Sequence, residues 1–375
     1  MKFLIIDSYY PKFLNSVISS LTEDETNYTE LLDRLLRLRF GTADFYSRNL
    51  RSLGHEAEDI IFNCIPLQEL WACENGFSIL GSRMSIPHRI AKLSFIRKII
   101  GSVDSLLDIA IRQIRTIRPD ILYVQDLNLF PQEVLKKLRE EGAFRLAVGQ
   151  IACPLPSLDY LNGFDLILTS FPHYVDRFRG IGIKSEYFKI AFDSIVIDEI
   201  GILTKEHGCT FVGGLSPDHK ERSYFLEYLA KNVDIKFFGY GSEKLGRDSP
   251  IDKRHQGECW GLDMYRTLAK SHITINHHID VAENNANNMR LFEATGCGSL
   301  LITDNKLNIS EMFEPDKEIV TYNSNEEAVE KINFYLENPL EAVRIASAGQ
   351  KRTLREHTYL NRMEELILII NKYLK

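Results

Sequence analysis

The sequence predicts an α/β protein with two facing Rossmann-like domains, and three observations lead to this fold class. A length of 375 residues suggests two domains rather than one. From residue 1 to about residue 200, apolar strand-like runs alternate with helix-like segments, as in βα units around a parallel sheet. The pattern then restarts with a new first strand at Cys209–Gly213. We therefore expect two consecutive doubly wound halves.

In the first half, glycine and proline mark the ends of the expected helices. Gly54 and Gly142 follow helix-like segments, and Pro119 stops another, because proline cannot continue a helix. The expected strands are Phe3–Ile6, Glu58–Asn63, Ile121–Val124, Leu146–Gly149, Phe164–Leu168 and Tyr187–Ile190. The expected helices are Ala43–Leu53, Ser105–Ile117 and Gln132–Glu141.

The second half repeats the alternation and then becomes helical. The expected strands are Cys209–Gly213, Ile235–Phe238, His272–Asn276 and Ser299–Thr303. The expected helices are Glu221–Asn232, Leu262–Ala269, Asn325–Glu337, Leu340–Glu356 and Met363–Leu374. We place the domain boundary near residue 204, which gives a first domain of residues 1–204, a second of 205–356 and a final helical segment of 357–375.

Composition narrows the functional class. Charged residues make up 26% and hydrophobic residues 44%, as in ordinary soluble proteins, and no run approaches the roughly 20 apolar residues of a membrane span. The start of the chain is too short in its apolar part for a secretory signal and is better interpreted as a strand. Six cysteines without a CxxC pair argue against zinc or a disulfide framework and favour the cytoplasm. A net charge of −7 argues against nucleic acid as a partner.

The segment from Asn287 to Asp304 is the most informative in the chain. We expect asparagines to cap a helix, Gly296 and Gly298 to end it in a left-handed turn, and a buried strand to follow. The free N–H groups at a helix start can hold phosphate. Glu293 lies one to two turns further on, within reach of a sugar attached to that phosphate.

This segment resembles the donor-binding segment of the group 1 glycosyltransferases, and most closely their CgeB-like (spore maturation protein) branch, in which an Arg-x-x-Glu-Ala helix followed by Gly-x-Gly recurs. The resemblance implies a GT-B fold whose last helix packs back on the N-terminal domain. It implies that Glu293 holds the ribose hydroxyls and that the backbone from Asn287 through Asn288 and Met289 to Arg290 holds the diphosphate. The alternative is an ordinary helix with a surface pair between Arg290 and Glu293.

Two departures from the group's pattern stand out. The paired-glutamate motif E-x7-E would place its first glutamate at position 285, where this chain has Asn285, with Glu283 two residues earlier. This weakens any inference of a retaining mechanism that relies on that first carboxylate. The segment from Leu168 to Asp193 resembles the end of the group's N-terminal domain, but Ala191-Phe192-Asp193 replaces the usual Asn-Gly-Val-Asp.

Ligands of open α/β sheets bind beyond the carboxyl ends of the strands. Gly213 and Gly214 follow the first strand of the second half and would let a phosphate approach the backbone. Lys220 and Arg222 come next, and fixed cations stabilise the charge of a departing diphosphate. The alternative is a solvated charge cluster at a helix start.

Two further strand ends complete the predicted donor site. Gly239-Tyr240-Gly241 is either a tight turn or, as the resemblance implies, a loop near the nucleotide base. His277 and His278 follow the next strand, and one of them is expected near the transferred sugar. Successive side chains at a strand end point to opposite faces, which disfavours a metal site built from both histidines.

Candidates in the first half lack a diagnostic spacing. Asp126 is the proposed catalytic base in this half, as His277 is the proposed catalytic residue of the second, although Asp126 could instead cap the following segment. Gln150, His173 and Asp7 are expected on the acceptor side, and an ordinary loop histidine is the alternative for His173.

Residues 83–118 hold eight Lys or Arg against Asp104 and Asp108, with isoleucine and leucine at helical spacing. A basic amphipathic helix can lie on an anionic membrane or bind an anionic acceptor. The alternative, which we favour, is a surface helix with its apolar stripe in the core.

The expected function is that of a cytoplasmic glycosyltransferase, which could associate with the inner face of the membrane. It would use a nucleoside diphosphate sugar, with UDP or GDP as the nucleotide, and no cofactor or metal. The acceptor would be a glycan, a lipid-linked molecule or a protein, and closure of the two domains would exclude water. A sugar-nucleotide epimerase and a non-catalytic binding or structural protein remain alternatives, because fold does not imply function.

Overall fold

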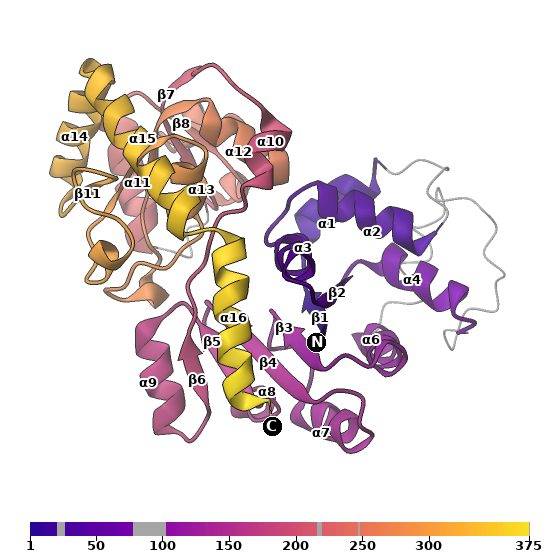
Figure 1. Ribbon diagram of the computed structural model, residues 1–375. Helices are drawn as coiled ribbons and strands as arrows, with labels where there is room; N and C mark the ends of the chain where they lie inside the picture. The colour runs from indigo at the N-terminus through magenta and orange to yellow at the C-terminus, as the bar shows by residue number, and fades with distance from the viewer. Residues whose placement is uncertain (21–26, 78–102, 216–219, 247, 375) are drawn as a thin grey trace. The chain divides into compact units, whose positions relative to one another are not determined.

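The chain forms two compact units, which are described separately. The computed structural model describes residues 1–20, 27–77, 103–215, 220–246 and 248–374 (Figure 1). The first unit comprises Met1–Thr169, His173–Tyr187 and Met363–Lys375, and the second comprises Ser170–Pro172 and Phe188–Arg362.

The first unit is built on a parallel sheet with the strand order β2-β1-β3-β4-β5-β6. Its strands are β1 (Lys2–Asp7), β2 (Glu56–Ile61), β3 (Ile121–Val124), β4 (Leu146–Ile151), β5 (Leu166–Thr169) and β6 (Ser185–Tyr187). In the register of the sheet, Ile6 of β1 pairs with Ile60 of β2 and with Val124 of β3. Asp7 and Gln125, which follow Ile6 and Val124, therefore lie next to each other at the carboxyl ends of β1 and β3. The order reverses between β1 and β3, which makes the carboxyl ends of these strands the topological switch point.

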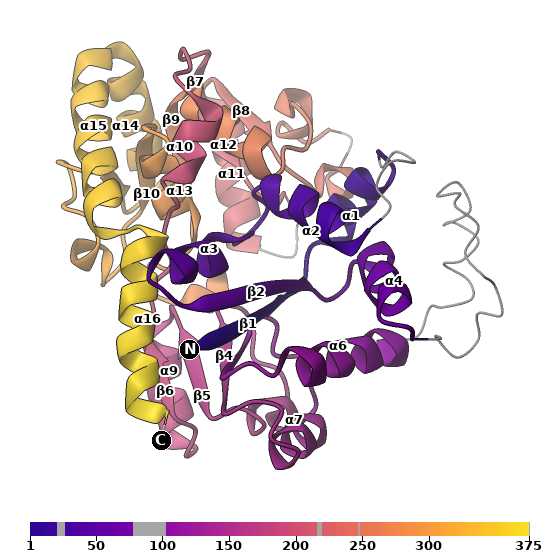
Figure 2. The same cartoon turned by 45° about the vertical axis from the view of Figure 1, so that its right-hand side comes forward.

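Helices surround this sheet. They are α1 (Pro11–Ile18), α2 (Tyr28–Arg37), α3 (Phe45–Ser52), α4 (Ile65–Glu74), α6 (Val103–Ile117), α7 (Gln132–Glu140), α8 (Leu158–Leu161) and α9 (Pro172–Gly180). Helix α3 packs on β1 and β2, while α4 contacts both α2 and α6 (Figure 2). None of the helices in the described ranges is long and apolar enough to cross a lipid bilayer.

The last helix, α16 (Tyr359–Tyr373), returns to the first unit, as the resemblance implied. The hydroxyl of Tyr373 donates to a carboxylate oxygen of Glu186 at 2.8 Å, and the Lys184 ammonium lies 5.9 Å from the Tyr373 ring. Both views place the yellow α16 beside β6 and α9 (Figures 1 and 2). The chain end therefore supports the sheet edge at β6.

The second unit is built on a parallel sheet with the strand order β11-β10-β9-β7-β8. Its strands are β7 (His207–Val212), β8 (Ile235–Phe238), β9 (Ser271–Asn276), β10 (Leu300–Asp304) and β11 (Val320–Tyr322). Its helices are α10 (Ile195–Ile200), α11 (Lys220–Asn232), α12 (Gly261–Ala269), α13 (Arg290–Gly296), α14 (Asn325–Glu337) and α15 (Pro339–Glu356), with short 3₁₀ turns η2 (Ser242–Lys244), η3 (Asp252–Arg254), η4 (Asp280–Ala282) and η5 (Ile309–Glu311). The switch point of this sheet lies between β7 and β9.

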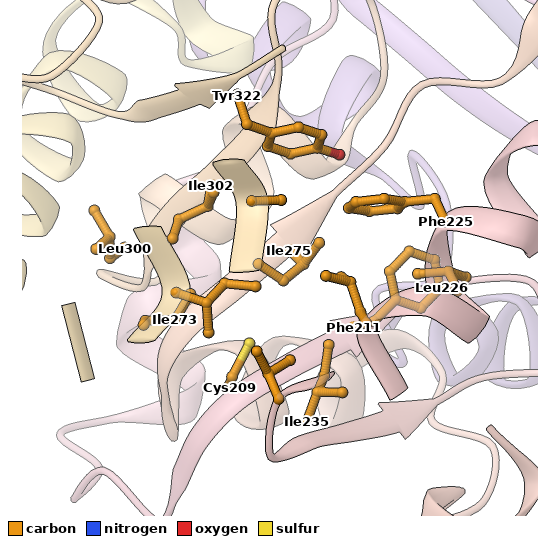
Figure 3. Packing of buried hydrophobic residues seen from close by; sticks show 14 of the residues in the cluster. Cys209, Phe211, Phe225, Leu226, Ile235, Ile273, Ile275, Leu300, Ile302 and Tyr322 are labelled. Carbon is orange, nitrogen blue, oxygen red and sulfur yellow. The ribbon is translucent and has the colours of Figure 1, made fainter. Parts of the chain in front are cut away.

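The core of the second unit forms where strand side chains meet α11, α14 and α15. Fully buried Ile235 comes from β8, fully buried Ile273 and Ile275 come from β9, and Phe225 and Leu226 reach them from α11 (Figure 3). Because both faces of a parallel sheet are covered, its strands are largely apolar. This packing fixes the strands whose carboxyl ends carry the predicted site.

The division between the units falls earlier than the expected boundary at residue 204. Residues 188–204 belong to the second unit. The N–H of Phe192 donates to the carbonyl of His357, and the N–H of Tyr359 donates to the carbonyl of Phe192, both at 2.9 Å. These bonds near the start of α16 attach residues 188–204 to the second unit. Phe192 and His357 are 165 positions apart, so the bond between them leaves no sign in the local hydrophobic periodicity.

Most predicted elements agree with the structure to within a few residues, but some expectations were wrong. The strand expected at Tyr187–Ile190 lies at Ser185–Tyr187. Helices α1, α2, α4, α8, α9 and α10 and strand β11 were not predicted. Several of these elements are eight residues or shorter, so their periodic signal is weak.

Gly349 in α15 offers a test of the packing in the second unit. A Cβ atom there would lie 2.2 Å from the carbonyl oxygen of Glu318. We expect Gly349→Ala to lower the free energy of unfolding by about 1–3 kcal/mol because the helix must shift. Gly180→Ala, whose Cβ meets nothing within 4 Å, is the matched control and should be neutral or stabilising. Calorimetric unfolding measures both, and equal stability of the two variants would contradict the close packing.

Candidate functional site

The loops after β7 and β8 lie against each other, on one side of the switch point between β7 and β9. The N–H of Gly213 donates to the carbonyl of Phe238 at 2.9 Å, and the N–H of Leu215 donates to the carbonyl of Tyr240 at 2.7 Å. Gly239 has φ +137°, and a Cβ on it would lie 1.9 Å from the carbonyl oxygen of Gly213. Only glycine fits at position 239. The predicted glycines therefore pack two loops closely, whatever ligand they approach.

An aromatic pair borders these loops. The rings of Tyr240 and Trp260 stack with centroids 5.2 Å apart and an interplanar angle of 15°. A Cβ on Gly214 would lie 2.9 Å from the Tyr240 ring, and Gly241, with φ +93°, directly precedes η2. Trp260, just before α12, was not among the predicted residues, because nothing in its neighbouring sequence connects it with Tyr240.

The predicted cations occupy the first turn of α11. Lys220 is exposed at the first position of the helix. One Nη of Arg222 donates to the carbonyl of Gly214 at 3.1 Å, which holds its guanidinium beside the loop after β7. The structure thus places fixed positive charge at the strand end where the diphosphate was expected.

His277 lies on the face of the sheet that α11 covers. Its ring stacks on Phe225 at 4.7 Å, and its Nδ1 lies 2.9 Å from the Tyr322 hydroxyl. The same hydroxyl donates to the carbonyl of Asn276 at 2.9 Å, so Nδ1 of His277 carries the proton and its Nε2 has the lone pair. Burial lowers the pKa of His277, which favours the neutral form of its ring. A catalytic role for His277 stays a prediction.

His278 faces the other side and belongs to a buried charge cluster. Its Nδ1 lies 2.7 Å from Oδ1 of Asp304, and its backbone N–H donates to the same oxygen at 3.1 Å. Lys306 Nζ lies 3.1 Å from the second oxygen of Asp304. Burial alone would raise the pKa of Asp304, but the His278 hydrogen bond and the nearby cations hold this pKa well below its ordinary value. Asp304 and Lys306 were not predicted.

The expectation that asparagines cap α13 was wrong. Met289 occupies the cap position with helical dihedral angles and no side-chain cap bond. Asn287 Nδ2 donates to the Ser170 hydroxyl at 3.3 Å, and Asn288 Nδ2 donates to Oδ1 of Asn276 at 2.7 Å. Both asparagines therefore bond to residues outside α13 rather than to the first turn of this helix.

Arg290 and Glu293 form an ion pair of 2.9 Å that is buried rather than on the surface, with side-chain exposures of 13% and 6%. Arg290 Nε also donates to the carbonyl of Val212 at 3.1 Å, and the Tyr265 hydroxyl lies 3.5 Å from Glu293. Burial raises the pKa of Glu293, and Arg290 offsets part of this effect. The pair thus joins α13 to the end of β7, beside the predicted diphosphate site.

The glycines that end α13 differ in role. Gly298 has φ +71°, which confirms the left-handed turn predicted there. Gly296 is the last helical residue, and a Cβ on it would lie 2.6 Å from the Phe192 ring, so the turn predicted for Gly296 was wrong. The buried strand β10 follows as predicted.

In the first unit, a polar network lies at the switch point between β1 and β3. The Thr42 hydroxyl donates to Oε1 of Gln125 at 2.8 Å, and the N–H of Ser8 donates to Asp7 at 2.7 Å. Burial and the nearby charge of Asp126 raise the pKa of Asp7 to about 7, although a backbone hydrogen bond opposes the shift. Asp7 is therefore a carboxyl that can exchange a proton near neutral pH.

The other predicted residues of the first unit have identifiable structural partners. Asp126 accepts hydrogen bonds from the N–H and Nδ2 of Asn128 at 3.1 and 3.2 Å, so it caps a turn. Oε1 of Gln150 accepts from the hydroxyls of Tyr46 and Tyr123 at 3.0 and 2.7 Å. His173 lies in the first turn of α9, not in a loop as its alternative assumed.

The first unit also holds a cavity of about 550 Å³ that the sequence did not indicate. It is lined by residues of α2, α3, α4, α6 and β2 and of the loop after α2. Among these residues are Arg39 of the loop, Arg51 of α3 and Asp59 of β2. Ser47 donates to one oxygen of Asp59. Burial raises the pKa of Asp59 to about 7, an effect that Ser47 reduces.

Two further predictions concern metals and the basic segment. Among the described residues, no group of three His, Cys, Asp or Glu side chains is arranged to hold a metal ion. Of the basic segment 83–118, residues 83–102 lie outside the described residues. In its described part, Arg115 pairs with Glu141 at 2.7 Å, and Arg112 lies 4.2 Å from the Phe77 ring centroid.

Residues 221–367 match the model of a protein family described as glycosyl transferase-like. A comparison with curated proteins gives no match. Solved structures match over nearly the whole chain. The Anabaena Alr3699/HepE protein with UDP-glucose matches with a TM-score of 0.59 at 12% identity and covers 99% of this chain and 100% of its own.

Two other solved structures have the same fold. The sucrose-phosphate synthase of Thermosynechococcus elongatus matches with a TM-score of 0.58 at 8% identity over 99% of each chain. A glycosyltransferase from Rickettsia africae ESF-5 matches with a TM-score of 0.58 at 14% identity, over 100% of this chain and 98% of its own. The protein therefore has the GT-B fold that the resemblance implied, and its second unit contains a glycosyl transferase-like segment.

The raised pKa of Asp59 predicts a pH-dependent stability. Between about pH 4 and pH 7 the carboxyl is protonated in the folded chain and ionised in the unfolded chain, so the free energy of unfolding falls as the pH rises. We expect Asp59→Asn to make this fall shallower, and Asp7→Asn to act in the same direction. Urea unfolding from about pH 5 to about pH 8 measures the slopes. An identical slope in wild type and Asp59→Asn would contradict the assignment.

Proposed function

We propose that this protein is a glycosyltransferase that moves a sugar from a nucleoside diphosphate sugar to an acceptor hydroxyl. One observation carries the proposal: Arg222, His278 and Glu293 all lie within the segment that matches the glycosyl transferase-like family, and all lie around the carboxyl ends of β7 and β9. UDP is the first candidate nucleotide, because the HepE structure of the same fold contains UDP-glucose.

The reaction requires positive charge at the leaving diphosphate. The bond between the anomeric carbon and the phosphate oxygen breaks as the acceptor oxygen attacks, and negative charge grows on the diphosphate. Arg222, fixed against Gly214, and Lys220 would stabilise that charge. These cations support the proposal that no metal is needed, and Glu293 would accept bonds from the ribose hydroxyls.

A base must take the proton of the acceptor hydroxyl, and the first unit offers two carboxylates at its switch point. Asp126 is held in a turn by two bonds from Asn128, whereas the pKa of Asp7 is raised to about 7. A catalytic base works best with a pKa near the operating pH. We therefore assign the base to Asp7, with Asp126 as the neighbouring charge and Gln150 and His173 on the acceptor side.

More specific assignments of family branch, nucleotide, location and acceptor rest on the sequence alone. They are membership of the CgeB-like branch, GDP as the alternative nucleotide, a cytoplasmic location, and a glycan, lipid-linked or protein acceptor. The basic segment 83–118 is the proposed contact with an anionic membrane or acceptor, on its residue pattern alone.

Nucleotide binding tests the proposal directly. We expect calorimetric titration of the full chain with UDP, GDP, ADP and CMP, first without metal and then with magnesium, to give metal-independent binding of one diphosphate, with UDP first. The reason is that protein cations supply the charge that magnesium supplies elsewhere. Binding of none of the four would contradict the proposal and favour a non-catalytic protein.

Glu293 gives a sharper test of the nucleotide site. Glu293→Gln removes a charged acceptor, and we expect UDP binding to weaken by about 1.5–3 kcal/mol, or about 10–150-fold. Tyr265→Phe is the matched control, since it removes the 3.5 Å contact and keeps the carboxylate. Thermal unfolding shows whether loss of the Arg290 pair destabilises the fold instead. Unchanged UDP affinity in a folded Glu293→Gln variant would refute the ribose assignment.

A further inference from the structure

The cavity in the first unit lies beside β2, the outer strand of the described sheet (Figure 2). Four consecutive residues of this strand, Ala57–Ile60, contribute to the lining, and the strand continues to Ile61. The cavity therefore runs along the body of β2 rather than beyond its carboxyl end. Asp7 and Gln125, by contrast, lie at the carboxyl ends of β1 and β3. The cavity and the strand ends with the candidate base are thus different parts of the unit.

The lining of the cavity is partly buried and partly exposed. The exposed fractions of Arg39, Asp59 and Trp71 are 6%, 8% and 7%. The exposed residues of the lining are Thr29, Asp33, Arg37, Arg51 and Glu58. The volume of about 550 Å³ falls within the range of about 300–1,000 Å³ that is typical of small-molecule sites. The cavity thus joins buried polar groups to the solvent.

One carboxyl oxygen of Asp59 has no hydrogen-bond partner within the described ranges of the chain. The Ser47 hydroxyl donates to Oδ2 of Asp59, whereas Oδ1 is buried and unpartnered. A buried polar atom without a hydrogen bond is costly, and most such atoms in proteins have a partner. Because Asp59 lines the cavity, a molecule inside the cavity is placed to supply this partner.

The charges around the cavity are mixed. The described lining carries four carboxyl groups and three guanidinium groups. Arg39 pairs with Asp44, and the Lys2 ammonium lies 3.1 Å from the Glu58 carboxylate. Neither sign of charge dominates, so a ligand with one strong charge would lie close to groups of its own sign. A neutral ligand with several hydroxyl groups fits this lining better, because a hydroxyl both donates and accepts.

Two further properties of the lining favour hydroxyl groups on a ring. Near neutral pH the Asp59 carboxyl exchanges between its acid and ionised forms, since burial raises its pKa to about 7, and a hydroxyl pairs with either form. Tyr28 and Trp71 also line the cavity, and the Trp71 ring is held by stacking on Phe77 with an interplanar angle of 12°. Aromatic rings offer a large apolar surface, which matches the C–H faces of a sugar ring.

We infer that the cavity beside β2 binds a neutral saccharide, whose hydroxyl groups bond to Asp59 Oδ1 and to the guanidinium of Arg51 and whose ring lies against Tyr28 and Trp71. One Nη of Arg51 already donates to the carbonyl of Ala57 at 2.8 Å, which fixes this guanidinium at the cavity. The inference concerns binding alone, at a site outside the proposed reaction, and so it does not rest on the proposed function.

Calorimetric titration of the full chain with sugars tests the inference. The neutral sugars are glucose, galactose, N-acetylglucosamine, maltose and cellobiose, and the charged sugars are glucosamine and glucose 6-phosphate. We expect at least one neutral sugar to bind, with a higher affinity than either charged sugar. Arg51→Ala and Asp59→Ala should each weaken its binding about 10-fold or more, because each removes a charged hydrogen-bonding group.

Arg179→Ala is the matched control. Nη2 of Arg179 also donates to a backbone carbonyl, that of Ser185, at 2.8 Å, and Ser185 belongs to β6 at the opposite end of the strand order. We expect this variant to bind the sugar as wild type does. Thermal unfolding shows whether each variant is folded.

Four results would overturn the inference. They are binding of no neutral sugar, tighter binding of glucosamine or glucose 6-phosphate, unchanged sugar affinity in folded Arg51→Ala and Asp59→Ala, and equal weakening in Arg179→Ala. Nucleotide binding is measured separately, and the donor residues belong to the second unit. Failure of the saccharide site therefore leaves the proposed function standing, and absence of UDP binding leaves the saccharide site standing.

Discussion

The buried carboxylate of Asp304 is the constraint on which the carboxyl edge of the second sheet depends. A charge removed from water is tolerated only when it is paired and hydrogen-bonded. Asp304 meets this need with the imidazole and backbone of His278 on one oxygen and Lys306 on the other. Lys306 in turn holds the carbonyl of Glu283, and so the loop that leads into α13. Satisfying one charge therefore fixes the end of β9, the loop after β10 and the approach to Arg290 and Glu293.

The sheets could be predicted because their signals are local. Buried parallel strands are short apolar runs, and Pro119 marks the end of the helix before β3. Strands β3 and β8 and helix α14 were predicted to the residue. Short elements such as α1 and β11 carry too few residues for a periodic pattern. The division between the units escaped prediction for another reason. It depends on the backbone bonds between Phe192 and the start of α16, which join distant parts of the chain.

The sequence predicted where the residues of the candidate site lie better than it predicted their hydrogen-bond partners. Residues beyond strand ends can be read from the sequence, and Gly213, Arg222 and His278 lie at such ends. The partners of these residues cannot be read in this way. Asparagine is a favoured residue at helix N-caps. Asn288 instead donates a hydrogen bond to Asn276, because the end of β9 lies beside Asn288. Asp304 looks like the last residue of a strand until the fold brings His278 to it across 26 positions. Trp260 escaped notice for the same reason.

The polar groups of the second unit are divided by strand in a way that matches the two ends of a sugar nucleotide. Beside β7 lie cations, with Arg222 fixed against Gly214. Beside β9 lie two buried polar atoms that have no hydrogen-bond partner within the described part of the chain, His278 Nε2 and Asn288 Oδ1. These strands are neighbours in the sheet and so lie about 4.8 Å apart. That is the scale on which a phosphate, which only accepts hydrogen bonds, adjoins a sugar, whose hydroxyls can donate them. In the reverse orientation phosphate oxygens would face the buried amide oxygen of Asn288, which only accepts hydrogen bonds. The chemistry of the strand ends therefore favours one direction of the proposed donor across the sheet.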